Sequence, residues 1–481
     1  MQQVSNPLSH AWRSIPDAMV RTMFAIPGIA ALIMFILIRP QEFIPLLQRV
    51  PLLHLFAMFA VVGWVIDVRL RRTQPMATPA LPWAVAFLVW AVVSIAVIVP
   101  DKLIREVLEV SILFALYGTI AHGIQKFRTF QIVAGVMALT CGFVALVCFH
   151  QGLADKQCVG GIEQDNELTG VPDGRPCETP DNCRGPDAEP GLDYHCEKIG
   201  AFGTYSVEGR VRYRGDLNDP NEVALVIAAG GMSLLIGFMR RRPSALVWIG
   251  SLIGITIGAI AVMMTQSRGG QIAMLLVLFV YLVRRYGVWA FVPASALGVP
   301  LMLLGGRSDS SADESTQQRY EAWSSGLDMF HKNPLVGVGA GQFNDHHYLT
   351  AHNSFVLTAA EMGLPGMVFF VAIIYVSMKS LIVGVRTLAT VPGAEVAQVW
   401  GMALLASLTA TCFSISTLSF AYKSVLWILF GLIGAWTNCV RHHRPEFTVR
   451  LTWRDLIIIV LACLGYLMVF LPIFLRYKGE R

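Results

Sequence analysis

Charged residues are scarce in this chain of 481 residues, since only 14% are Asp, Glu, Lys or Arg while 55% are apolar. A soluble globular protein carries roughly 25% charged residues. The net charge is only +5 and the basic residues lie in short loops, which excludes a nucleic-acid footprint. The apolar runs are continuous rather than alternating, which disfavours a transmembrane β-barrel. The chain is therefore predicted to be an all-α polytopic membrane protein.

Several common motifs are also missing. There is no CxxC pair and no HExxH, and the glycine-rich stretch from Pro334 to Gly341 lacks the Lys-Ser or Lys-Thr of a nucleotide loop. That stretch is interpreted as a tight link that lets a loop fold back over the membrane face. The polar stretch around it has no carboxylate pair of the glycosidase kind. No signal-peptide cleavage pattern precedes the first apolar run, which is expected to be an uncleaved span.

The apolar runs predict about twelve or thirteen transmembrane helices, because a bilayer core needs roughly 20 apolar residues per helix. The thirteen runs are Met23–Ile38, Leu52–Val68, Leu81–Val99, Val107–Ala121, Phe130–Phe149, Glu222–Met239, Leu246–Met264, Gln271–Val283, Val288–Leu304, Gly363–Val383, Val396–Leu418, Ser424–Val440 and Leu456–Phe474.

Basic residues gather on one side of these spans, as the positive-inside rule requires of the cytoplasmic side. They are Arg69, Arg71, Arg72, Lys126, Arg128, Arg240, Arg241, Arg242, Arg284, Arg285, Lys379, Arg386, Arg441, Arg444, Arg450 and Arg454. The predicted organisation is a cytoplasmic N-terminus (1–22), N-terminal helices (23–150), a periplasmic cysteine loop (151–221), central helices (222–304), a periplasmic catalytic loop (305–362), C-terminal helices (363–475) and a tail (476–481). Thirteen spans place this tail outside, and twelve would return it to the cytoplasm.

Four cysteines share the first long loop, whose residues 151–200 contain eleven Asp and Glu against four Lys and Arg. Cys158, Cys177, Cys183 and Cys196 predict a disulfide-stapled loop in an oxidising compartment, with three pairings open. A zinc knuckle is the alternative. The five other cysteines lie in or beside apolar runs and are interpreted as small packed hydrophobic residues.

Any catalytic site is expected in the polar stretch from Thr316 to Gly366. Its four histidines are His331, His346, His347 and His352, whose spacing fits no common metal motif. His352 differs from the others because it precedes Asn353, a candidate helix cap, just before a membrane helix. A neutral imidazole there can accept a proton from an attacking hydroxyl. A hydrogen-bonded histidine at a helix entry is the alternative.

Cationic side chains near the same face could bind phosphate, since guanidinium groups bind phosphate in a bidentate manner. Arg268 lies in a tight exterior turn, where the alternative is a snorkelling helix-end arginine. Arg319 lies on a predicted amphipathic helix through Phe330, where the alternative is a salt bridge. Further candidates are Arg210, Arg212 and Arg214, whose alternative is a solvated edge, and Lys423 in a short exterior turn. The turn from Asn218 to Asn221 is predicted to start a helix.

Three groups of these exterior residues together resemble the O-antigen ligase and Wzy-type polymerase superfamily. The largest comprises Arg319, Trp323, Gly326, Leu327, Phe330, Asn333, Pro334, Leu335, Gly337, Val338, Gly339, Phe343, His352, Asn353, Gly363, Leu364, Pro365 and Gly366. It ends in the family's spacing of His-Asn, nine residues and Gly-x-x-Gly. The others are the arginine turn Ser267-Arg268-Gly269 and the segment from Arg214 through Asn218-Asp219-Pro220-Asn221 to Ala224, which has one Asp inserted into the family's commoner spelling.

The resemblance implies a GT-C type membrane glycosyltransferase that works without a metal or a cofactor, in the bacterial inner membrane with its active face in the periplasm. The donor would be a glycan on undecaprenyl diphosphate, and the acceptor either lipid A–core, for a ligase, or another lipid-linked glycan, for a polymerase. Arg268 and Arg319 would hold the diphosphate with support from Arg214, and His352 would be the base. Arg210, Arg212, Lys423 and Asn353 are supporting candidates, and the only other expected partners are membrane lipids.

Two features depart from the family, namely the acidic cysteine loop and the thirteenth span, and they leave the acceptor open. A lipid-linked glycan flippase or another multi-pass transporter is the rival function. A transporter would place charges in the middle of several spans and show repeat symmetry. The polar residues instead cluster at one face, which favours a transferase.

Overall fold

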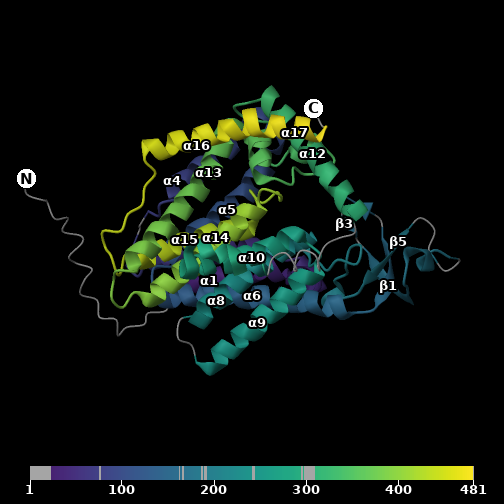
Figure 1. Cartoon of the computed structure of the whole chain (residues 1–481), viewed down its shortest axis with the longest axis horizontal. Coiled ribbons are helices and arrows are strands. Elements are labelled where there is room, and N and C mark those ends of the chain that lie inside the picture. The colour runs from purple at the N-terminus through teal and green to yellow at the C-terminus, as the bar shows by residue number, and fades with distance from the viewer. Residues whose placement is uncertain are drawn as a thin grey trace, which may run out of the picture.

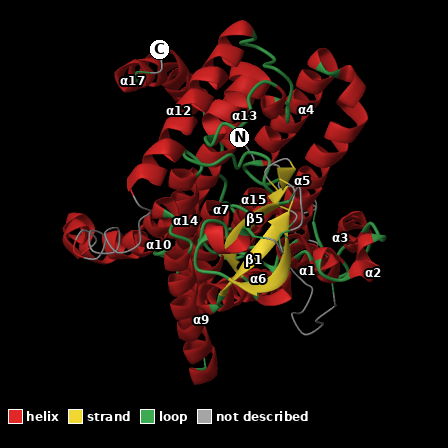
Figure 2. Cartoon of the chain, turned by 90° about the vertical axis from the view of Figure 1, so that its right-hand side faces the viewer, coloured by secondary structure: helices red, strands yellow, loops and turns green. Residues whose placement is uncertain are grey.

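The computed structural model describes residues 23–74, 77–161, 163–164, 167–168, 170–185, 188, 192–240, 244–293, 296 and 309–479. These residues form a bundle of long helices with a small β-sheet at one end of its long axis (Figure 1). Viewed from that end, the strands lie in front of the bundle (Figure 2). The predicted cytoplasmic segment 1–22 lies outside the described residues.

The N-terminal helices pack closely where glycine faces a neighbouring backbone. They are α1 (Ala25–Ile38), α2 (Pro45–Gln48), α3 (Leu52–Arg69), α4 (Leu81–Ile98), α5 (Leu103–Gly123) and α6 (Phe127–Leu153). A Cβ atom on Gly28 of α1 would lie 2.6 Å from the backbone nitrogen of Ala60 in α3. Small residues of this kind let membrane helices approach and gain van der Waals contact. At the end of the pair, the buried Asp67 carboxylate accepts hydrogen bonds from the backbone N–H groups of Phe24 and Ala25.

The first long loop folds into two small antiparallel sheets. Its strands are β1 (Lys156–Gly161), β2 (Glu163–Gln164), β3 (Glu167–Leu168), β4 (Val171–Pro176) and β5 (Asp193–Lys198). The order of the larger sheet is β4-β1-β5, and β2 pairs with β3. All the strands of the described chain lie in this loop.

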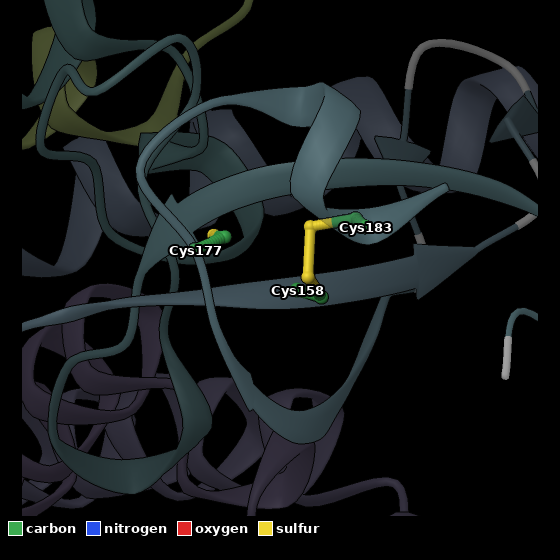
Figure 3. A group of neighbouring side chains, drawn as sticks. All are labelled: Cys158, Cys177 and Cys183. Atoms are coloured by element: carbon green, nitrogen blue, oxygen red, sulfur yellow. A yellow bond between two sulfur atoms is a disulfide. The ribbon is translucent and has the colours of Figure 1, made fainter. Parts of the chain in front are cut away.

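Two disulfides staple this loop, as the cysteine pattern predicts. One joins Cys158 to Cys183 and the other joins Cys177 to Cys196. Strands β1 and β5 place Cys158 directly opposite Cys196, yet each bonds to a cysteine from the segment between the strands. Figure 3 shows the first disulfide with Cys177 beside it. A zinc site would need the thiolates that these two bonds consume.

The central and C-terminal helices include two spans that contain a π-helical segment. They are α7 (Pro220–Leu225), the π-helical segment Val226–Met232, α8 (Ser233–Arg240), α9 (Ala245–Met264), α10 (Arg268–Tyr286), α12 (Asp309–Lys332), α13 (Ser354–Leu388), α14 (Glu395–Ser414), α15 (Ser424–Val440), α16 (Trp453–Gly465), the π-helical segment Tyr466–Phe470 and α17 (Leu471–Lys478). The first three join into one apolar span over Pro220–Arg240, and the last three into one over Trp453–Lys478.

The predicted all-α polytopic fold is confirmed. In the described part of the chain, nine helices are long and apolar enough to cross a membrane, and two shorter apolar helices are α1 and α15. Each predicted span coincides with a helix, apart from Val288–Leu304, which lies mostly outside the described residues. The predicted amphipathic helix is also present as α12, with Leu327 and Phe330 buried.

Two boundaries matter for the site. Helix α13 begins at Ser354, nine residues before the predicted start of that span at Gly363. The last helix, α17, ends beside α12 (Figure 1), with the Phe474 ring 5.3 Å from that of Tyr320. The end of α17 therefore lies beside the polar stretch. The choice between twelve and thirteen spans stays a prediction.

We expect proteolysis of the oxidised protein under non-reducing conditions to release peptides linked as Cys158–Cys183 and Cys177–Cys196. Mass spectrometry after alkylation identifies the linked peptides, and the five cysteines of the helical part should carry the alkyl label once the protein is unfolded. Peptides linked as Cys158–Cys196 or Cys158–Cys177 would contradict this connectivity.

Candidate active site

Helix α13 is broken at Gly363, where φ is 65° and ψ is −169°. This region of backbone conformation is open essentially to glycine alone. The break frees carbonyl groups that a continuous helix would use, and other segments supply donors. The backbone N–H groups of Val338 and Gly339 donate to Ala360 and Glu361 at 2.9 and 3.0 Å, and Trp90 Nε1 donates to Met362 at 2.9 Å.

The glycine-rich stretch that supplies two of these donors fits against the break with no space for side chains. Gly337 has φ 67°, and a Cβ atom there would lie 2.2 Å from the Glu361 carbonyl carbon. The buried Glu361 carboxylate accepts from the N–H groups of Gly341 and Phe343 at 3.0 and 2.9 Å. The stretch thus has a definite task beyond that of a tight link, because its N–H groups satisfy the broken helix.

The start of α13 is tied to the turn 415–423, which joins α14 to α15. Asn353 caps the helix, its Oδ1 accepting from the N–H groups of Phe355 and Val356 at 3.0 and 3.1 Å. Ser354 donates from its backbone N–H to Ile415, donates from Oγ to Leu418, and accepts at Oγ from the Phe420 N–H. These bonds fix the residue that comes just before the cap.

That residue is His352, which is half-buried in the left-handed conformation with φ 45°. Burial lowers the pKa of His352 from 6.5, the charge of Arg319 lowers this pKa further, and the charge of Asp219 opposes both. The imidazole is therefore uncharged at neutral pH. Arg319 lies on α12 and Asp219 caps α7, so charges from two other elements act on this one side chain.

The starts of α7 and α10 lie together at the same end of the bundle. Asp219 caps α7 and accepts from Asn221 Nδ2 at 2.8 Å, while Ser267 caps α10 and donates from Oγ to Asn221 Oδ1 at 2.7 Å. Arg268 is the first residue of α10 and is exposed. A Cβ atom on the next residue, Gly269, would lie 4.0 Å from Thr417 Oγ1, so this helix start also adjoins the turn 415–423.

Lys423 closes that turn and forms a short ion pair. Its Nζ lies 3.0 Å from the carboxylate of Glu222, in the first turn of α7. Burial lowers the pKa of Lys423, but the carboxylates of Glu222, Asp216 and Asp219 together raise this pKa above 10.5. Lys423 therefore stays charged and holds α7 against the turn.

The three candidate cations Arg210, Arg212 and Arg214 differ in exposure, because two of them are buried. Arg210 and Arg212 are each 8% exposed. Arg210 donates to the Thr265 carbonyl at 3.0 Å and to Asn221 Oδ1 at 3.3 Å, so it belongs to the frame of the site. Arg212 donates to the Tyr205 carbonyl at 3.2 Å, and its guanidinium lies over the Tyr205 ring. The alternative of a solvated edge fails for both.

Arg214 is half-buried and occupied by backbone carbonyls. It donates to Glu42 at 3.2 Å and to Phe202, and it lies over the Phe43 ring. Beside it, Arg39 pairs with Asp216 at 2.6 Å. These contacts of Arg214 are thus with the segment that follows α1 and with the cysteine loop.

The other three histidines remain separate from His352. His331 and His346 are exposed, and His347 is half-buried with its ring bonded to the backbone of Leu349. Among the described residues, one group of three His, Cys, Asp or Glu side chains lies close enough together to hold a metal ion. It comprises Cys158, Cys177 and Cys183, whose sulfur atoms are in disulfides.

The sequence analysis did not connect four residues with the candidate site. They are Asp219, which it expected only as part of a helix start, Glu222, Glu361 and Tyr466, whose hydroxyl accepts a hydrogen bond from Asn353 Nδ2. The first three carried a signal, because a carboxylate at the edge of an apolar run is costly unless it is paired or hydrogen-bonded. Tyr466 carried none, since it lies in an ordinary apolar span.

Residues 254–371 match the family model described as O-Antigen ligase. The match runs from the middle of α9 through α10 and α12 to the middle of α13, and it includes Arg268, Arg319, His352 and the break at Gly363. Arg214, Lys423 and the last helix lie outside it. The resemblance to the O-antigen ligase and polymerase superfamily is thereby confirmed. A search of the curated proteins finds no match.

We expect Gly363→Ala to destabilise the protein by at least about 1–3 kcal/mol, the usual strain of a side chain in such a backbone region. The added Cβ would also lie 2.2 Å from the Leu335 carbonyl oxygen. The matched control is Gly465→Ala in α16, where the backbone is helical and no atom lies within 4 Å of the new Cβ. Thermal unfolding in detergent should show a lower midpoint for Gly363→Ala alone, and equal midpoints would contradict the importance of the break.

Proposed function

We propose, from the match to the O-antigen ligase family, that this chain transfers or polymerises glycans carried on undecaprenyl diphosphate at the exterior face of a bacterial inner membrane. The family match supports a glycosyltransferase-type enzyme of surface polysaccharide. The observation that carries the residue assignments is the setting of His352. Its uncharged imidazole lies at the start of a membrane helix, under the influence of the charges of Arg319 and Asp219.

His352 is proposed as the general base. The acceptor hydroxyl oxygen attacks the anomeric carbon of the donor, the bond from that carbon to the diphosphate oxygen breaks, and the hydroxyl proton passes to the imidazole. A base for this step must be neutral before the reaction, and the lowered pKa supplies that state at pH 7. Asp219 would stabilise the imidazolium that forms.

Arg268 and Arg319 are proposed to hold the diphosphate, whose negative charge grows as undecaprenyl diphosphate leaves. Arg268 is the exposed first residue of α10, and a helix N-terminus adds its own attraction for anions. Preplaced cations of this kind stabilise a leaving group without Mg²⁺. Arg214 is proposed to support these two arginines, although its guanidinium already binds two carbonyls.

The acceptor is proposed to be lipid A–core or the growing end of another lipid-linked glycan. Glycan analysis of a deletion strain separates the two. Loss of a ligase leaves bare lipid A–core while polymer accumulates on its carrier, whereas loss of a polymerase leaves single repeat units. Loss of a flippase, the rival function, would stop the supply of donor at the exterior face.

His352→Ala and Arg268→Ala should abolish surface polysaccharide assembly while the protein still accumulates in the membrane, because a positioned base alone contributes about 10²–10⁴-fold. His346→Ala is the matched control, since that histidine is exposed and should be dispensable. The measurement is transfer by purified protein from a lipid-linked donor, with a chelator present to test metal independence. Full transfer by either His352→Ala or Arg268→Ala would contradict the proposed mechanism.

The pH dependence of transfer should change when the charge of Arg319 beside His352 is removed. Activity needs neutral His352, so it is present above the pKa of that histidine and is lost as the pH falls through it. Arg319→Gln removes a charge that lowers this pKa. The acidic limb of the residual activity should therefore move to higher pH. Arg285→Gln, exposed at the other end of α10, should leave the limb where it is. An unmoved limb in Arg319→Gln would remove His352 as the titrating base.

A further inference from the structure

The last helix, over Trp453–Lys478, is bound at both ends to elements of the site although most of its surface is free. Only 22% of its most apolar window is buried within the protein. At its first turn, the Asp455 carboxylate accepts from Lys379 Nζ at 2.7 Å and from Tyr375 Oη at 2.8 Å, both on α13. This helix lies beyond the residues that match the family model.

Near its middle, the same helix contacts the cap of α13. Asn353 Nδ2 donates to Tyr466 Oη at 2.9 Å, and the Asn353 side chain is 1% exposed. Tyr466 opens a π-helical segment, Tyr466–Phe470, and such segments are frequent at functional sites. The Asn353 amide thus has both ends engaged, with Oδ1 on the start of α13 and Nδ2 on the last helix.

A row of aromatic rings continues from Tyr466 to α12. Tyr466 stacks on Phe470 with centroids 5.7 Å apart, and Phe470 stacks on Phe474 at 6.0 Å. Phe474 then meets Tyr320 at 5.3 Å and Trp323 at 6.0 Å. The row therefore begins beside the neighbour of His352 and ends on the neighbour of Arg319.

We infer that the last helix is a positioning element of the proposed active site and that Tyr466 is its positioning residue, holding His352 and Arg319 in register through Asn353 and the row of rings. This inference rests on the proposed function, because it assigns these two residues as base and diphosphate ligand. The physical reason is that a buried amide N–H left without an acceptor costs free energy. Without the Tyr466 hydroxyl, Asn353 would turn to satisfy Nδ2 and carry the adjoining His352 backbone with it.

The direct test is Tyr466→Phe, which removes one oxygen and keeps the ring in the row. We expect kcat for transfer from an undecaprenyl-diphosphate-linked glycan to fall about tenfold, the scale of one lost buried hydrogen bond. KM for the donor and the thermal midpoint should stay near those of the wild type. Tyr477→Phe, on the same helix and 83% exposed, is the matched control and should leave kcat unchanged.

A double-mutant cycle distinguishes positioning from a general structural effect. Asn353→Ser keeps a capping oxygen for α13 but is too short to reach Tyr466. Tyr466→Phe should therefore have no further effect on kcat in the Asn353→Ser background, and a full additional loss there would overturn the inference. An unchanged kcat for Tyr466→Phe alone, with transfer abolished in His352→Ala, would reject the inference and leave the proposed function intact. Transfer retained in His352→Ala would instead reject the proposed function.

Discussion

The site depends on one requirement, that backbone groups freed inside a membrane helix find partners within the protein. The break at Gly363 leaves the carbonyls of Ala360, Glu361 and Met362 without helical donors, and the glycine-rich stretch and Trp90 supply them. Between the break and the cap lie nine residues, Ser354 to Met362, which span about 13 Å of helix. The spacing of the motif therefore sets how far His352 stands from the break, and the glycines are needed where the two backbones touch.

The turn 415–423 is the second organising feature, because it gathers helix starts that are distant in the sequence. Ser354 binds the turn through its backbone and its hydroxyl, Lys423 holds α7 through Glu222, and Gly269 brings α10 against Thr417. The N-terminal ends of these helices carry the positive ends of their dipoles, and all of them lie beside this turn. Three of them at one place favour an anion there, independently of the arginine side chains.

Much of this could be predicted from the sequence where one local rule decides the outcome. Apolar run length predicted the spans, the cap at Asp219 and the amphipathic α12 followed from local patterns, and the cysteine spacing predicted a stapled loop. The pairing of those cysteines could not be predicted. Cys158 and Cys196 lie opposite each other on β1 and β5, yet they are not bonded to each other. The burial of Arg210 and Arg212 and the contact of Tyr466 with Asn353 depend on tertiary packing, which no local pattern reports.

The electrostatics also imply an order of events in the proposed mechanism. In the free protein the charge of Arg319 helps to keep the pKa of His352 low, so the imidazole is neutral but a weak base. A bound diphosphate would offset the charge of Arg319, and the pKa of His352 would rise toward that of a stronger base. The acceptor hydroxyl would then meet an effective base only when the donor is in place. In the proposed mechanism, Arg319 would add to the effect of burial in keeping His352 neutral before the reaction, and it would couple the basicity of His352 to the presence of the leaving group.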